Sequence, residues 1–237
     1  MRPSDVLVEI HGVTKDYQSL RPLRVSSLTL HERQSVAMLG FDKAMAEVLV
    51  NLITGATVPD TGSVSVFGQP TTSIENADAW VQTLDRIGLI SDRALLVDRF
   101  TAEQNLVMPL SLEIENMSPM LQARARELAE EVKLPAEELG LPTGSLPTSS
   151  QARIRLGRAL ALSPRLVLAE HPNALTSVDD TLPFAKDYAR VVEARELASL
   201  VITADHGFAN AIADEVLTLE AATGLVTSSS RWRRWFS

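Results

Sequence analysis

Residues 35–55 of the chain have the sequence SVAMLGFDKAMAEVLVNLITG. The apolar run at 35–39 predicts a short buried strand, Gly40 opens a loop, and the apolar helix that follows closes at Gly55. This order is the layout of a phosphate-binding loop, in which backbone N–H groups and a helix N-terminus face an anion. A lysine and a serine or threonine normally complete such a loop, and they hold the phosphate charge and Mg²⁺. Because they are missing here, we expect a nucleotide-site scaffold whose chemistry has been removed.

The composition of the chain limits its class. Its 237 residues are 45% hydrophobic, which suits one large domain, or one domain with a subdomain. The formal charge of −8 disfavours general nucleic-acid binding, and the absence of cysteine excludes disulfides and cysteine-based metal sites. We find no secretory signal at the N-terminus, and no apolar run reaches the ~18–20 residues that span a bilayer. Membrane association is therefore expected only through a partner or a surface contact.

Apolar patterning predicts alternating strands and helices. The predicted strands are 6–10, 23–30, 35–39, 63–67, 86–90, 166–169 and 200–203, with a final hairpin of 215–219 and 225–226. The predicted helices are 44–54, 76–84, 106–112 with a capping box at Thr101 and Gln104, one from Ser118-Pro119 through Val132, 149–162 and 179–197. Alternation of this kind implies a parallel sheet, and the short connections among the first strands imply antiparallel pairing.

Two segments stand apart from this pattern. An all-helical insert, about residues 91–157, interrupts the alternation of strands and helices. The tail at 228–237, SSSRWRRWFS, interleaves arginine with aromatic residues. Such a tail can contact an anionic membrane surface or a partner, and a disordered terminus is an equally good interpretation.

The order and spacing of six segments resemble the ATP-binding subunits of ABC transporters over about residues 6–226. These segments are LGFDKAMAEVLVNLITG (phosphate loop), VPDTGSVSVFG, IGLISDRALL (Q-loop), FTAEQNLVMPL, LPTSSQARIRLGRALALSPRLVLAEHP (signature and Walker B) and LVITADHGFANAIADEVLTL (switch region). The resemblance implies an α/β, P-loop NTPase-like fold, with a mostly parallel sheet flanked by helices, an antiparallel β subdomain and a helical subdomain. It implies a single domain over residues 1–227, with the helical subdomain at about 91–157.

None of the resembling motifs is intact. In the phosphate loop, Ala46 stands where the family has its lysine, Glu47 where it has the Mg²⁺-binding serine or threonine, and Lys43 and Met45 replace glycines. A carboxylate at Glu47 repels phosphate, since two charges ~4 Å apart at an effective dielectric of ~20 interact by ~4 kcal/mol. The carboxylates of Asp42 and Glu47 could instead occupy the anion-binding end of the helix, with Lys43 paired to one of them, or both could be solvated charges.

The remaining motifs depart in the same direction. Glu170 falls on the metal-associated aspartate, His171 on the carboxylate that activates water, and Ala204 on the switch histidine. We expect His171 to be a hydrogen-bonded structural residue, although a neutral imidazole can act as a base. The signature-like residues are Pro147, Thr148, Ser149 and Ser150, and we expect Ser149 and Ser150 to cap the following helix. The remnant nucleotide contacts are Tyr17, Gly40, Lys43 and Ser91, where Tyr17 either stacks on adenine or simply packs, and Ser91 falls near the Q-loop glutamine.

The resemblance therefore implies a degenerate ATP-binding subunit that does not hydrolyse ATP and is not an enzyme. We expect it to pair with a competent ATPase subunit as a heterodimer, to couple to a membrane permease through residues 91–112, and to lie on the cytoplasmic face of the membrane. We expect no catalytic residue, no metal, no cofactor and no nucleic-acid partner. A second hypothesis is a weakly active ATPase that uses ATP and Mg²⁺, with Lys43 on the phosphates and Glu170 or His171 holding metal and water. A third is a free-standing regulatory or scaffold protein.

Overall fold

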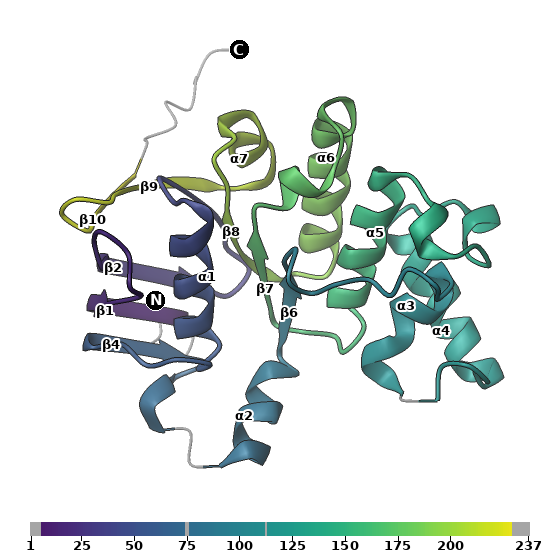
Figure 1. Ribbon diagram of the computed structural model, residues 1–237, viewed down its shortest axis with the longest axis horizontal. Helices are drawn as coiled ribbons and strands as arrows, with labels where there is room; N and C mark the ends of the chain where they lie inside the picture. Colours follow the sequence, from purple (N-terminus) through teal and green to yellow (C-terminus); the bar gives the residue numbers. More distant parts are fainter. Residues whose placement is uncertain (1–5, 74–75, 112, 229–237) are drawn as a thin grey trace.

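A six-stranded sheet forms the centre of the computed structural model, which describes residues 6–73, 76–111 and 113–228 (Figure 1). In order across the sheet, the strands are β10 (Leu225–Ser228), β9 (Glu215–Glu220), β3 (Ser35–Leu39), β8 (Ala198–Ile202), β7 (Leu166–Glu170) and β6 (Ile87–Ile90). All neighbours pair in parallel except β10 and β9, which form the predicted hairpin. Strands β7 and β8 are buried along their whole length, as their continuous apolar sequence predicts.

A second, antiparallel sheet covers one side of this centre. Its strands are, in order, β2 (Leu23–His31), β1 (Val6–Lys15), β4 (Thr61–Val66) and β5 (Gln69–Pro70). Strand β1 runs five residues beyond its predicted end at residue 10. Its pairing with β4 shifts register between His11 and Thr14, and Gly12 between them has a φ of 56°. A glycine that adopts positive φ lets the strand continue through this irregularity.

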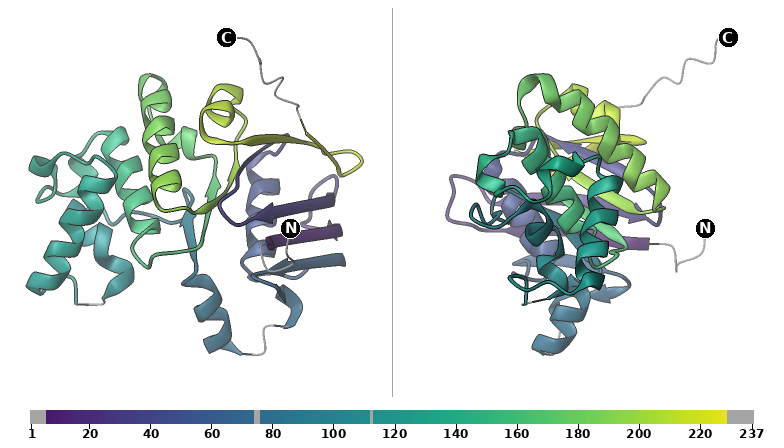
Figure 2. Two further views of the ribbon diagram at one scale, coloured as in Figure 1. Left: turned by 180° about the vertical axis from the view of Figure 1, so that it is seen from behind. Right: turned by 90° about the vertical axis from the view of Figure 1, so that its right-hand side faces the viewer.

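Seven α-helices surround the sheets in the described part of the chain. They are α1 (Lys43–Ile53), α2 (Ala77–Leu84), α3 (Ala102–Val107), α4 (Pro119–Glu131), α5 (Thr148–Ala159), α6 (Val178–Ala194) and α7 (His206–Ile212). Helix α1 shares one apolar core with both sheets. Helices α3, α4 and α5 gather at the end of the molecule farthest from the antiparallel sheet (Figures 1 and 2). The predicted fold class, an α/β architecture with an antiparallel and a helical part, is confirmed.

Local capping signals account for several helix ends. The capping box of Thr101 and Gln104 is present at the start of α3, and the Ser118 side chain caps α4 with Pro119 at its first position. Helix α3 ends at Val107 and not at residue 112. A 3₁₀ turn at Met108–Leu110 follows, because Pro109 lacks the N–H that would continue an α-helix. Helix α7 was not predicted.

Within the ranges that the structure describes, no helix is long and apolar enough to cross a membrane. Residues 229–237 lie outside those ranges, so the interpretations of the basic and aromatic tail stay predictions.

Candidate functional site

Three segments meet at the carboxyl ends of the parallel strands. Gly40 follows β3, Ser91 follows β6, and Glu170 ends β7. Ligands of open α/β sheets bind at this edge, where loops leave the strands. Side-chain contacts described below join the loop after β6 to both α1 and β7, so Lys43, Glu47, Ser91 and Glu170 lie close together at this edge.

The loop after β3 needs glycine at its first position. Gly40 has a φ of 88°, and a Cβ built on it would lie 2.3 Å from the backbone oxygen of Leu219. Asp42 then caps α1, with its Oδ1 accepting the N–H of Met45 at 2.8 Å. The N–H of Ala46 donates to the backbone oxygen of Asp42 at 3.0 Å. Two N–H groups at this helix start therefore already have partners within the chain, and one of these is a carboxylate.

Ala46 and Glu47 take different directions on α1. Ala46 is 0% exposed and belongs to the apolar core between the sheets. Glu47 faces the loop after β6, where its Oε1 lies 3.2 Å from Nη1 of Arg93. One hypothesis placed the carboxylates of Asp42 and Glu47 together at the start of the helix. The contact with Arg93 shows that Glu47 is directed elsewhere.

The carboxylate of Glu170 is buried and has two partners. Its side chain is 7% exposed, it accepts the Ser91 hydroxyl at 2.8 Å, and it forms a close ion pair with Nη2 of Arg93. Burial lowers the pKa of Arg93, but the hydrogen bond and the charge of Glu170 raise it, and the pKa shifts upward overall. Arg93 also donates to the side-chain oxygen of Asn51 at 3.3 Å. Arg93 therefore ties α1 to β7 with its charge maintained.

Lys43 lies at the first position of α1 and reaches the loop after β6. Its ammonium pairs with the carboxylate of Asp92, and its side chain is 74% exposed. The hydrogen bond to Asp92 raises the pKa of Lys43, and the same bond lowers the pKa of Asp92. The suggested pairing of Lys43 with Asp42 or Glu47 is wrong, because Asp92 is its partner.

His171 is held by its backbone. It adopts a left-handed conformation with φ 43° and ψ 49°, and its N–H donates to the backbone oxygen of Ile202 at 2.7 Å. Its Nε2 is buried and has no hydrogen-bond partner among the described residues. The prediction of a hydrogen-bonded imidazole therefore fails at this atom, since the main chain and not the ring fixes the residue.

Ala204 lies exposed between β8 and α7. Asp205 caps α7 by accepting the N–H of Phe208 at 2.9 Å, and His206, the first residue of α7, is exposed. Position 204 therefore carries a methyl group and no side chain that can form a hydrogen bond.

Tyr17 is half-buried and packs against the core shared by α1 and the two sheets.

The signature-like residues begin α5. Pro147 is the N-cap residue with φ −56° and ψ 153°, and no side chain caps the helix. Thr148 is the first helical residue, so Ser149 and Ser150 already lie inside the first turn. The prediction that these two serines cap α5 is wrong, because the helix starts before them.

Sequence analysis missed Arg93, Asp92 and Asn51. Arg93 is 46 residues from Glu47 and 77 residues from Glu170 along the chain. The only available signal was the position of Asp92 and Arg93 next to Ser91 in the loop predicted to reach this edge.

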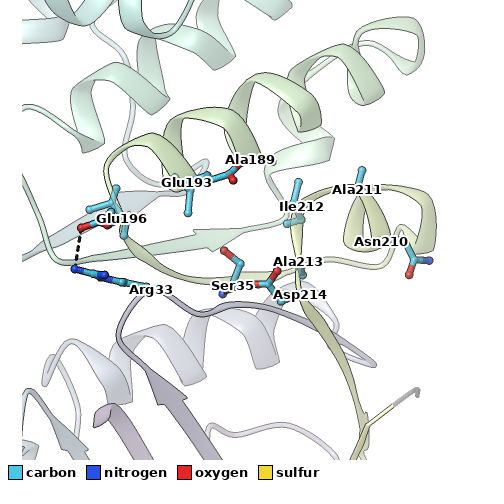
Figure 3. A pocket seen from close by; sticks show the side chains of 12 residues that line it. Arg33, Ser35, Ala189, Glu193, Glu196, Asn210, Ala211, Ile212, Ala213 and Asp214 are labelled. Atoms are coloured by element: carbon cyan, nitrogen blue, oxygen red, sulfur yellow. Dashed lines mark hydrogen bonds and ion pairs between the residues drawn. The ribbon is translucent and has the colours of Figure 1, made fainter. Parts of the chain in front are cut away.

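A separate hollow of about 570 Å³ lies at the opposite end of β3 (Figure 3). Ser35, the first residue of β3, lines it together with residues of α6 and α7. An ion pair of 2.9 Å between Arg33 and Glu196 crosses one side. Because the phosphate-loop residues lie at the other end of the strand, this hollow is not part of the candidate site.

Comparison with known proteins gives the chain a family. The model of the ABC transporter family matches residues 23–174. The chain is 26% identical over 215 residues to the Fe(3+) ions import ATP-binding protein FbpC of Serratia marcescens, which covers 90% of this chain and 60% of that protein. It is 29% identical over 201 residues to the lipoprotein-releasing system ATP-binding protein LolD of Geobacter metallireducens. This match covers 83% of this chain and 88% of that protein. The chain thus spans about three fifths of the iron-import relative and most of the lipoprotein-releasing one.

Solved structures support the same fold. The dimeric post-hydrolysis structure of the ATP-binding cassette MJ0796, bound to ADP and Pi, superposes with a TM-score of 0.77 at 20% identity, covering 95% of this chain and 100% of that chain. The structure of cbiO1 from Clostridium perfringens, part of the ABC transporter complex cbiONQ, gives a TM-score of 0.76 at 14% identity, covering 90% and 84%. At these identities the likeness concerns the fold alone.

The comparisons contradict the prediction that the chain uses no cofactor. The matched relatives are named as ATP-binding proteins, and one structural neighbour holds ADP and Pi. ATP with Mg²⁺ is the ligand pair that this family implies. The residues fit such a pair in kind, because Glu47, Ser91 and Glu170 offer the oxygen ligands that Mg²⁺ takes, and the N-terminus of α1 faces the same edge.

Proposed function

The chain belongs to the ABC transporter family as an ATP-binding domain, and we propose that it binds nucleotide without hydrolysing it, as the regulatory half of a dimer. One observation carries this proposal. The position of the phosphate-loop lysine is Ala46, whose side chain is buried in the core, and the ammonium of Lys43, at the start of the same helix, is paired with Asp92. Neither residue therefore offers a free ammonium to the β- and γ-phosphates.

Other residues of this edge favour nucleotide binding. Gly40 leaves room for close backbone approach, and the N-terminus of α1 favours an anion once Asp42 releases the N–H of Met45. Glu47, Ser91 and Glu170 would hold Mg²⁺, which, when bound, neutralises phosphate charge. These groups support binding.

Two further positions argue against turnover. At position 171, where the family orients water with a carboxylate, this chain has an imidazole whose Nε2 is buried. At position 204, where the family has its switch histidine, a methyl group is exposed. General base catalysis typically accelerates a reaction by ~10²–10⁴-fold. Without a side chain at positions 171 and 204 that orients or deprotonates water, the rate of hydrolysis is expected to fall by about this factor.

The proposed partners follow from the family. We expect a heterodimer with a competent ATPase subunit and contact with a membrane permease, which would place the chain on the cytoplasmic face of the membrane. The dimeric state of the MJ0796 cassette supports a dimer, and the membership of cbiO1 in a transporter complex supports a transporter partner. The expectation of no nucleic-acid partner rests on the net charge of −8. Copurification from membranes tests the partners, and a chain isolated with neither subunit would favour the free-standing regulator.

The test of the function compares binding with turnover. Calorimetry with Mg²⁺–ATP and a phosphate-release assay are run on the purified chain and on Glu170→Gln, with the melting temperature of each as a control for folding. We expect saturable ATP binding by the wild-type chain, weaker binding by Glu170→Gln because it loses a Mg²⁺ ligand, and phosphate release at the same background level in both. Phosphate release by the wild-type chain that disappears in Glu170→Gln would overturn the proposal and establish the weak ATPase instead.

A further inference from the structure

Arg93 occupies the space between the two carboxylates that fit Mg²⁺. Its Nη1 lies 3.2 Å from Glu47 on α1, and its Nη2 forms a close ion pair with Glu170 at the end of β7. The Nε of Arg93 also donates to Glu170, at 3.4 Å. One guanidinium thus bridges both acidic side chains from a loop that follows a third element, β6.

We propose that Arg93 is a tethered cation that competes with Mg²⁺ for Glu47 and Glu170, so that Mg²⁺–ATP enters only after the guanidinium withdraws. This inference rests on the proposed function, because it names a regulation of the same site. It concerns Arg93, which lies in the segment quoted for the Q-loop resemblance but at a position to which the resemblance assigned no role.

The burial of the three side chains explains why the bridge forms. A carboxylate as buried as that of Glu170 is costly unless a cation and hydrogen bonds compensate it. The Ser91 hydroxyl supplies one hydrogen bond at 2.8 Å, and Arg93 supplies the charge. The planar guanidinium suits this task, because it presents several donors to carboxylates in a fixed fork.

The bridge is stronger at one end than at the other. The side chain of Glu47 is 44% exposed and that of Arg93 is 36% exposed, so water screens this contact. Glu170 is buried, so its contact is screened less. The guanidinium can therefore release Glu47 first and reach solvent, while Glu170 keeps its bond to Ser91.

Mg²⁺ and Arg93 cannot use the same carboxylate oxygens together. Mg²⁺ takes its oxygen ligands at ~2.0–2.1 Å in near-octahedral geometry, which leaves no room for an N–H donor on the same lone pairs. With Arg93 in place, two positive charges would also face each other. Binding of Mg²⁺ must therefore include the withdrawal of Arg93.

The test is a Mg²⁺ titration without nucleotide, at pH 7.5, on the wild-type chain and on Arg93→Gln. Calorimetry measures affinity, and the melting temperature with and without Mg²⁺ gives a second readout. We expect Arg93→Gln to bind Mg²⁺ at least about tenfold more tightly than the wild type, and Mg²⁺ to raise its melting temperature more. Lys43→Gln is the matched control, since it removes the same charge from the neighbouring pair with Asp92 without touching Glu170. We expect it to leave the Mg²⁺ affinity within about twofold of the wild type.

Two results would overturn the inference. One is equal Mg²⁺ affinity in the wild type and Arg93→Gln, and the other is tight binding that survives in the double variant Arg93→Gln/Glu170→Gln. If Arg93→Gln does not fold, Arg93→Lys keeps the charge but loses the fork, and its Mg²⁺ affinity should still exceed that of the wild type. Equal affinity of Arg93→Lys and the wild type then overturns the inference. Because no ATP is present, failure here is distinguishable from the phosphate-release result that would overturn the proposed function.

Discussion

Replacement of Asp42 should change stability and nucleotide affinity in opposite directions. The Asp42 carboxylate accepts the N–H of Met45 at 2.8 Å, so it both caps α1 and occupies a donor that an anion would use. Loss of the cap in Asp42→Ala costs about 1 kcal/mol of unfolding free energy, which lowers the melting temperature by ~2–4 °C in a chain of this length. The same change frees the N–H and removes a negative charge from the phosphate-facing end of the helix.

The magnitude of the gain in affinity follows from the exposure of Asp42. The side chain is in water, so a phosphate charge ~4 Å away feels a repulsion of about 1 kcal/mol. Its removal corresponds to roughly fivefold tighter binding of Mg²⁺–ATP. Asp42→Asn separates the two effects, because asparagine caps helices as well as aspartate does but carries no charge. We expect this variant to keep most of the melting temperature and still to bind ATP more tightly.

Thermal unfolding and calorimetric titration with Mg²⁺–ATP measure both quantities on the same samples. If Asp42→Asn folds normally and binds ATP no more tightly than the wild type, the carboxylate does not compete with phosphate. The explanation of the loop in terms of an internal anion would then be wrong.

Four further substitutions, one of them a control, test the loop, the core and a buried ion pair by thermal and denaturant unfolding. Gly40→Ala combines positive φ with a Cβ 2.3 Å from a backbone oxygen of β9 and should cost several kcal/mol, at the upper end of single substitutions. Gly140→Ala, which meets no atom within 4 Å, should be nearly neutral, and equal losses would refute this reasoning. Asp187→Ala should cost ~3–5 kcal/mol, because the buried carboxylate pairs with Arg153 at 3.1 Å and with Lys133 at 2.6 Å; a loss under about 1 kcal/mol would show that these pairs are dispensable. Ala46→Lys should lower stability by several kcal/mol and not restore turnover, since the new ammonium starts in the core; a stable, active variant would contradict this.

The fold could be predicted because its signals are local. Strand β3 matches its predicted bounds, and the capping box at Thr101 and the Ser118-Pro119 start of α4 lie where short motifs placed them. Helix α7 escaped because it has only seven residues, from His206 to Ile212, and too few apolar positions to show a period. The start of α5 was misplaced because Pro147 took the N-cap position that serine normally favours.

The site could be predicted only in part, since its charges pair across the fold. The sequence placed Ser91 and Glu170 at one edge, and the structure joins them at 2.8 Å. The cation between Glu47 and Glu170 is Arg93, which lies in a loop that no periodicity or helix cap marks in the sequence. Its contacts depend on the pairing of β6 with β7, which brings this loop next to Glu170. Long-range ion pairs depend on the distance between elements, which a linear pattern does not contain.

The unusual residues of the phosphate loop depend on one another through the start of α1. The helix begins at Lys43 under the Asp42 cap, and this phase turns the methyl of Ala46 into the core and the carboxylate of Glu47 toward β6. A lysine at position 46 would be buried in this phase, and the buried carboxylate of Glu170 requires the cation that Arg93 provides. The substitutions therefore form one alternative arrangement, in which side chains of the chain itself compensate the charges at an edge built for nucleotide. Gly40, β3 and the apolar face of α1 build the strand, loop and helix of the fold, and Asp42, Glu47 and Arg93 arrange the charges at its edge.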